Sequence, residues 1–150
     1  MVNGSDAAIY HEVPGGPELL QWFGQVPNFH DAEILSLELQ RKKPSILRLH
    51  GWTSTAEEDG TYVLDREAVV SFTLYDVMDL QVEGFSHQNV IGSLNLRRAT
   101  DRAERRGYLS LAPLPGDVEI ELEPCFGLDG FIRARAVTIA FVPGAPVDGF

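Results

Sequence analysis

The stretch Ile34-Leu35-Ser36-Leu37-Glu38-Leu39 decides the fold class, because its leucines alternate with polar residues. Successive side chains of an extended chain point to opposite faces, so this period of two predicts a β-strand with one buried side. The three leucines would face the interior and the polar residues would face water. The same rhythm returns in residues 46–52, with Leu47 and Leu49 expected inward, and the polar turn around Pro44 would join both strands as a hairpin.

Further segments along the chain favour β-strands by alternation or by their β-branched and aromatic content. They are residues 68–75, 80–85, 118–123 and 131–142, with shorter segments at 62–64 and 108–112 and a turn leading into a strand over residues 86–96. Turns rich in Gly, Pro and Asp separate them, and no helical crossover that a parallel sheet requires lies between them. The sequence therefore predicts a mostly β protein, an antiparallel sandwich or partly open barrel of seven or eight strands.

One short N-terminal helix is expected over residues 16–24. Pro17 suits the first helical position, Glu18 suits the positive end of the helix dipole, and Gly24 suits the C-terminal cap. Residues 1–15 lack periodicity and residues 143–150 contain Gly and Pro, so both ends are expected to be flexible. The length of 150 residues and the lack of an internal repeat predict a single domain over residues 1–150.

The composition narrows the classes of partner. The formal net charge of −10 argues against nucleic acid, whose phosphates need a basic surface. It permits a basic protein partner, although a negative charge also simply keeps a protein in solution. The single cysteine allows no internal disulfide, no signal peptide is recognisable at the N-terminus, and no apolar run is long enough to span a bilayer. We therefore expect a cytoplasmic protein without a membrane partner.

The basic residues are unevenly distributed. Five of the 12 Lys and Arg residues fall within ten positions, namely Arg97, Arg98, Arg102, Arg105 and Arg106. The simpler interpretation is a solvent-facing segment whose arginines pair locally with carboxylates at helical or cross-strand spacing. The alternative is a patch that faces an anion.

Two short motifs carry histidine. His30 and Asp31, just before the first strand, could form an acid–base pair or two metal ligands, or could close a turn. His87 and Asn89 could present two polar groups to a ligand, or could form a polar turn that satisfies its own backbone. These histidines and His50 could meet in space as a metal site, but no metal-ligand spacing or catalytic motif supports it. We therefore assign no catalytic residue, metal or cofactor.

The segment Asn28-Phe29-His30-Asp31-Ala32-Glu33-Ile34-Leu35-Ser36-Leu37-Glu38-Leu39 resembles the opening strand motif of the immunity protein 50 family. The segment Gly84-Phe85-Ser86-His87-Gln88-Asn89-Val90 is similar to a mid-chain motif of related uncharacterised bacterial proteins. That family is associated with neutralising the toxins of bacterial polymorphic toxin systems. The resemblance implies a non-catalytic cytoplasmic protein that binds a cognate toxin domain, and it carries over no catalytic residue.

Three hypotheses follow. The first is a binding protein whose acidic face complements a basic toxin domain. This face would consist of Glu57, Glu58 and Asp59 with Glu119, Glu121 and Glu123. The second is an enzyme or metal-dependent protein that uses the histidine motifs. The third is a structural or oligomerisation module whose open sheet edges pair between subunits. The sequence leaves the oligomeric state and the binding face open.

Overall fold

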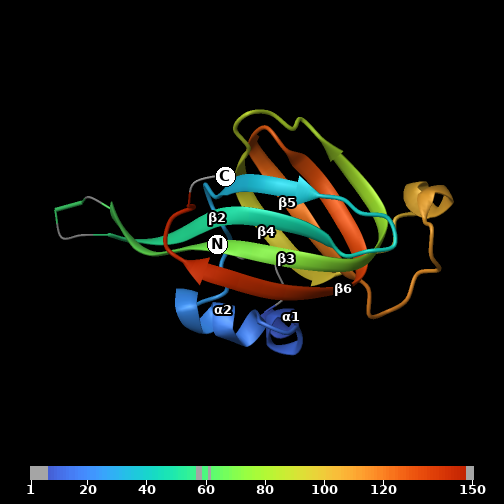
Figure 1. Ribbon diagram of the computed structural model, residues 1–150, viewed down its shortest axis with the longest axis horizontal. Helices are drawn as coiled ribbons and strands as arrows, with labels where there is room; N and C mark the ends of the chain where they lie inside the picture. Colours follow the sequence, from blue (N-terminus) through green and yellow to red (C-terminus); the bar gives the residue numbers. More distant parts are fainter. Residues whose placement is uncertain (1–6, 57–58, 61, 148–150) are drawn as a thin grey trace.

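The computed structural model describes residues 7–56, 59–60 and 62–147. Its helices are α1 (Ala7–Glu12), α2 (Gly16–Phe23) and the 3₁₀ helix η1 (Ala103–Tyr108). Its strands are β1 (Glu33–Glu38), β2 (Ser45–Ala56), β3 (Tyr62–Glu83), β4 (Val90–Arg98), β5 (Val118–Phe126) and β6 (Asp129–Pro143). The protein is mostly β, as the sequence predicts (Figure 1).

All six strands form one antiparallel sheet in the order β1-β2-β3-β6-β5-β4. The sheet curls until its first and last strands meet at the single pair Glu33 and Val90. Backbone hydrogen bonds beside this pair reinforce the junction, among them those from the Ile34 amide to the Asn89 carbonyl (2.7 Å), from the Asp31 amide to the Ile91 carbonyl (3.0 Å) and from the Ile91 amide to the Ala32 carbonyl (3.0 Å). The junction is narrow, so the sheet encloses a core without forming a regular barrel.

The core fills the concave side of the sheet. Phe72 on β3 lies edge-on to Phe29 with ring centroids 6.1 Å apart, and Phe29 lies edge-on to Phe23 of α2 at 5.9 Å. Leu47 and Leu49 of β2 are fully buried, which confirms the inward face expected for this strand. Helix α2 packs against β3 and β6, and α1 contacts β4, so the two helices complete the core that the strands leave open (Figure 1).

The expected count of seven or eight strands is wrong, and β3 explains most of the difference. Residues 62–64, 68–75 and 80–85, expected as separate strands, largely belong to this one strand of 22 residues. Asp76 adopts a left-handed conformation (φ 54°) and the register shifts between Val77 and Asp79, so the strand bends there without ending. Residues 108–112 are not a strand, because Tyr108 is the last residue of η1 and residues 109–112 form no regular structure.

The first strand also departs from simple alternation. The register of β1 on β2 shifts between Ile34 and Ser36, which leaves Leu35 as an extra residue. Ile34 and Leu37 therefore lie opposite Leu49 and Leu47 on the inner side, three positions apart. Leu39 lies beyond the end of the strand and is 52% exposed, so its expected inward position is wrong.

The predicted helix over residues 16–24 is confirmed as α2, with Gly24 as its left-handed cap (φ 75°). Residues 7–12, expected as part of an aperiodic arm, form the helix α1, which buries Ile9. The connection between the helices docks on β6, where the Ile139 amide donates to the Pro14 carbonyl (2.8 Å). The next residue must be glycine, because a Cβ at Gly15 would lie 1.7 Å from the Ile139 carbonyl oxygen.

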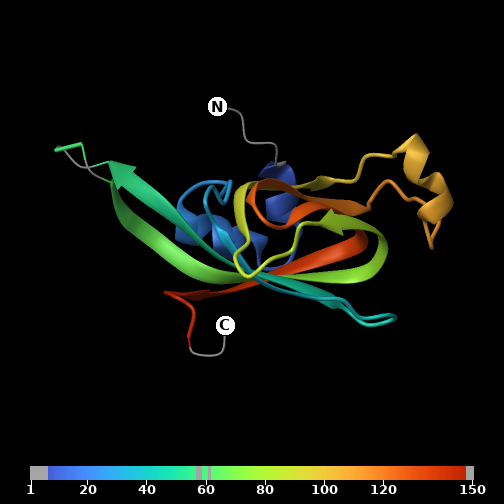
Figure 2. The ribbon, with the colours of Figure 1, turned by 90° about the horizontal axis from the view of Figure 1, so that it is seen from above.

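Two parts project from opposite ends of the molecule, the hairpin formed by β2 and β3 and the segment that contains η1 (Figures 1 and 2). Within the described part of the chain, every helix is too short or too polar to cross a membrane.

Candidate functional site

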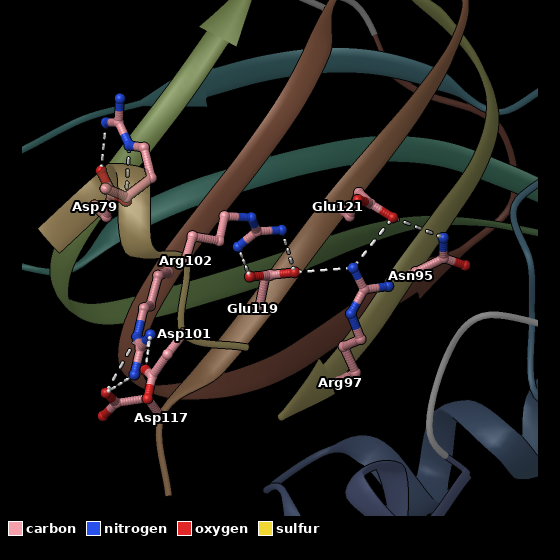
Figure 3. Close-up of polar contacts among 10 residues, drawn as sticks. Asp79, Asn95, Arg97, Asp101, Arg102, Asp117, Glu119 and Glu121 are labelled. Atoms are coloured by element: carbon pink, nitrogen blue, oxygen red, sulfur yellow. Dashed lines mark hydrogen bonds and ion pairs between the residues drawn. The ribbon is translucent and has the colours of Figure 1, made fainter. Parts of the chain in front are cut away.

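The segment between β4 and β5, residues 99–117, is held against the sheet by ion pairs rather than by apolar contacts. We call it the strap. Residues 99–116 are all described, and none of them is buried. The sheet residues beneath and beside the strap include charged side chains that are buried, namely Asp79 on β3, Glu119 on β5 and Arg133 on β6. Figure 3 shows Glu119 between Arg102 of the strap and Arg97 of β4, with Asp79 and Asp117 in separate groups of contacts.

Glu119 lies at the centre of one ionic cluster. Its carboxylate is 0% exposed and accepts from Arg97 across the β4–β5 pair at 2.9 Å. Arg102 of the strap donates to both carboxylate oxygens, one of them at 3.0 Å, and its guanidinium lies 4.0 Å from the centre of the Phe131 ring. The hydrogen bond to Glu119 raises the pKa of Arg102 above its ordinary value. Glu121 shares Arg97 at 3.2 Å.

Asp117 forms a second cluster at the end of the strap. It accepts from Arg133 at 2.8 Å and from Arg135 at 2.6 Å, and the Leu114 amide donates to it at 2.9 Å. Burial alone would raise the pKa of Asp117, but these donors outweigh it and hold the pKa below its ordinary value. Arg133 also donates to Asp101 at 2.9 Å. The two carboxylates outweigh the effect of burial on Arg133 and raise its pKa.

A third ionic contact joins the strap to β3. Arg105 donates to both oxygens of Asp79, at 2.6 and 3.1 Å, in the bidentate geometry that gives arginine–carboxylate pairs their strength. Its guanidinium also lies 4.2 Å from the Tyr108 ring centre. A hollow of about 560 Å³ opens beside Arg106 and Leu109, and strap residues alone line it, so its shape depends on these ionic contacts.

The three clusters balance in charge. Five arginines (Arg97, Arg102, Arg105, Arg133 and Arg135) meet five carboxylates (Asp79, Asp101, Asp117, Glu119 and Glu121). The local pairing expected for the arginine-rich stretch is confirmed for Arg97, which pairs across strands with its register partner Glu119. It is wrong for Arg102 and Arg105, whose carboxylate partners lie 17 and 26 positions away, and Arg98 pairs with the distant Glu12. Since arginine side chains stay protonated in proteins, this network holds fixed charges in place.

His30 and Asp31 lie together on the loop that closes the sheet. The His30 Nε2 and the Asp31 carboxylate are 3.5 Å apart, and the His30 Nδ1 lies 3.1 Å from the Gly92 carbonyl oxygen. Both side chains are exposed beside a shallow hollow of about 210 Å³ that Trp52 also lines. The loop is sharply bent, because Phe29 (φ 59°) and Asp31 (φ 63°) both adopt the left-handed conformation.

His87 and Asn89 do not face the same way. Asn89 is buried, and its side-chain oxygen accepts from the amides of Ser86 (2.9 Å) and Leu128 (3.0 Å). Its side-chain nitrogen donates to the Ser86 carbonyl at 2.8 Å. His87 is exposed. Asn89 thus joins the loop after β3 to the turn before β6, as the turn interpretation describes.

The histidines do not converge on a metal site within the described residues, where no three His, Cys, Asp or Glu side chains could hold an ion together. His50 instead pairs with Glu67 across β2 and β3 at 2.9 Å, and its ring lies 5.1 Å from that of Trp52.

The acidic face predicted from the sequence is wrong in one member and incomplete in others. Glu119 is buried under arginines and cannot face a partner. Glu57 and Glu58 lie outside the described residues, and Asp59 is exposed. Glu121 and Glu123 line a groove of about 420 Å³ together with Glu83 and Asp129, two residues that the sequence interpretation missed. Arg102, which is paired with Glu119, also lines this groove. We call it the acidic groove.

The acidic groove lies at one end of β3, β5 and β6. Glu83 and Asp129 are register partners, and Glu123 accepts a hydrogen bond from Ser93 at 2.8 Å. Within the described part of the chain, no arginine or lysine forms an ion pair with Glu83, Glu123 or Asp129. Two large aromatic side chains follow in the sequence and are exposed, Phe85 (66%) and Phe126 (57%).

The signal that could have identified the groove residues was present in the sequence. Glu123 ends the strand expected at residues 118–123, and Asp129 lies in the turn that leads to the strand expected at 131–142, so a hairpin would bring both residues to the same end of the sheet. Glu83 could not be added without the strand order, which places β3 beside β6.

Comparisons with known proteins found no match to this chain among protein-family models, curated proteins or solved structures.

Proposed function

We propose that this protein is a non-catalytic cytoplasmic binding protein of the immunity type, which neutralises a bacterial toxin domain by holding a basic segment of it in the acidic groove. One observation carries the proposal. Glu83, Glu123 and Asp129 line a groove without an ion-pair partner of their own among the described residues, whereas five other carboxylates are paired with arginines.

The physical argument rests on charge and on aromatic contact area. The chain carries a net charge of −10, and its exposed carboxylates attract a basic partner. This attraction speeds association, and the ionic strength sets its range. Phe85 and Phe126 supply apolar surface of the kind that anchors protein interfaces. A partly open barrel would present this groove on a rigid end of the sheet, so little ordering would accompany binding.

The experiment measures binding of purified toxin-like domains encoded beside this gene. The groove variant is Glu83→Gln/Asp129→Asn, and the control is Glu18→Gln/Glu104→Gln, which removes the same charge from exposed sites on α2 and η1. We expect the groove variant to weaken binding by about tenfold or more, and the control to weaken it by less than about threefold. Wild-type binding should also weaken as salt is added.

Two results would contradict the proposal in different ways. If no neighbouring toxin-like domain binds the wild-type protein, the function is wrong. If a domain binds but the groove variant and its control weaken binding equally, the groove is the wrong surface.

A further inference from the structure

The shallow hollow of about 210 Å³ beside the histidine loop lies between that loop and the part of β2 beyond His50, where the pairing of β2 with β1 ends. The loop contributes His30 and Asp31 to its lining, and β2 contributes Trp52 and Thr53. None of these residues lines the acidic groove, so the hollow is a separate site. Its chemistry therefore has to be derived from its own residues.

The loop holds its side chains in fixed positions. The Phe29 ring is buried in the core, the Asp31 amide donates to the Ile91 carbonyl at 3.0 Å, and the Asn28 carbonyl accepts from the Leu94 amide at 2.9 Å. Phe29 and Asp31 both keep the left-handed conformation (φ 59° and 63°), which is uncommon outside glycine and clusters at binding sites. A ligand would meet a preformed surface, so little ordering would oppose its binding.

His30 and Asp31 place two hydrogen-bond acceptors side by side. A neutral His30 ring that donates from Nδ1 to the Gly92 carbonyl oxygen, 3.1 Å away, keeps Nε2 as an acceptor. The Asp31 carboxylate lies 3.5 Å from Nε2, beyond the usual range of an N–H···O hydrogen bond. Among the described residues, no arginine or lysine lines the hollow. The two acceptors therefore suit a group with several donors and a positive charge, and an ammonium group has three donors.

The β2 side of the hollow suits a cation on an apolar stem. Trp52 supplies an aromatic ring, and such rings attract cations that lie within about 6 Å of the ring centre. The Thr53 hydroxyl is buried and has no hydrogen-bond partner among the described residues, whereas buried polar groups normally have one. The hollow is smaller than the roughly 300 Å³ at which pockets for drug-sized ligands begin, so it fits only the end of a chain.

We propose that this hollow binds a primary alkylammonium group, with Asp31 as its counter-ion, His30 Nε2 as a second acceptor and Trp52 as an aromatic wall. The group belongs either to a free amine or to a lysine side chain of a protein, because both present the same ammonium head on an apolar stem. The net charge of −10 favours cations in general. So small a group binds weakly, with a dissociation constant of about 1 to 10 mM.

The test is titration of the isotope-labelled full chain with n-butylammonium chloride, followed by NMR shifts of the backbone amides and the indole N–H groups. Titration at about pH 8 keeps histidine side chains neutral, and sodium chloride at equal ionic strength serves as the blank. We expect saturable shifts at residues 28–31 and 52–53. Tetramethylammonium, which has the charge but no N–H donor, should bind at least about fivefold more weakly, and neutral n-butanol should not bind.

A matched pair of variants tests the counter-ion. Asp31→Asn removes the charge and keeps the loop, because asparagine adopts the left-handed conformation as aspartate does. It should weaken butylammonium binding by about tenfold or more. Asp76→Asn is the same change at another exposed aspartate in the left-handed conformation (φ 54°), outside the hollow. This control should change binding by less than about twofold.

A second probe, Nα-acetyl-lysine methylamide, distinguishes the two sources of the ammonium group. Tighter binding of this probe than of butylammonium assigns the site to a protein lysine, and binding that is no tighter assigns it to a free amine. The proposal is overturned if butylammonium causes no saturable shifts at the hollow. It is also overturned if tetramethylammonium binds as well as butylammonium, or if both variants weaken binding equally. None of these results bears on toxin binding, which is measured with groove variants.

Discussion

Two adjacent residues of β5 are both fully buried, one among apolar side chains and the other among arginines. Ile120 faces the apolar core, and Glu119 faces the strap and its arginines, each with 0% exposure. The core excludes water through many non-directional contacts, which tolerate apolar substitutions that conserve volume. The ionic side depends on a few directional pairs, each of which offsets the desolvation of a charge. The comparison indicates that the core stabilises the whole fold and the network mainly positions one segment.

The largest effect should come from the core. Phe72→Ala removes the ring that contacts Phe29, and should lower the free energy of unfolding by about 3 to 5 kcal/mol, since the cavity cannot fully collapse. Phe72→Leu, which keeps most of the volume, should lower it by less than about 1.5 kcal/mol. Urea unfolding monitored by circular dichroism measures both values. Equal losses for the two variants would show that volume is not what matters at this position.

On the ionic side, Arg133→Met should be less damaging. The variant removes one partner of Asp117, but Arg135 and the Leu114 amide remain as donors to that carboxylate. We expect a loss of about 2 kcal/mol in the same unfolding experiment, the scale of a hydrogen bond to a charged group. A loss as large as that of Phe72→Ala would mean that the ionic face contributes to global stability as much as the core does.

Acid should separate the two regions further. Because the folded pKa of Asp117 lies below its unfolded value near 3.8, its carboxylate adds stability above that value. This contribution is lost as the pH falls through the folded pKa. Stability measured from pH 7 to pH 2 should therefore decline less steeply in Asp117→Asn than in the wild type. Parallel curves for the two proteins would contradict the assigned role of this carboxylate.

The smallest effect should be local. Arg105→Met releases the strap from Asp79, so amide exchange in η1 should accelerate while the melting temperature changes little. Arg106→Met is the matched control, because Arg106 is adjacent and exposed and forms no ion pair among the described residues. Exchange in the control should stay at the wild-type rate. Cooperative destabilisation by Arg105→Met would place the strap within the global folding unit.

Much of the fold could be predicted because the signals for strands and caps are local. The inward pair Leu47 and Leu49 follows from alternation, and α2 follows from Pro17 and Gly24. The gap between the strands expected at 68–75 and 80–85 coincides with the bend at residues 76–79, but pairing with β6 continues on both sides of it, whereas pairing with β2 ends at Leu74. Pairing with neighbours that are distant in the sequence overrides the local preference there.

The candidate site was less predictable, because its residues owe their roles to distant partners. Alternation correctly placed Glu119 on the face opposite Ile120, but nothing in its vicinity indicates that Arg102, 17 positions earlier, covers it. Likewise, Asn89 was one of two candidate ligands until its contact with the Leu128 amide, 39 positions away, assigned it to the fold.

The sequence by itself determined the antiparallel β class, the net charge of −10 and the inner face of β2, because each depends on composition or on periodicity within one segment. Only the tertiary structure decided which carboxylates pair with arginines and which line a groove. The order of β3, β6, β5 and β4 pairs Glu119 with arginines and leaves Glu83, Glu123 and Asp129 around a groove. The physical reason is that a charge is neutralised by whatever lies within a few ångströms of it, and folding rather than sequence distance sets those neighbours.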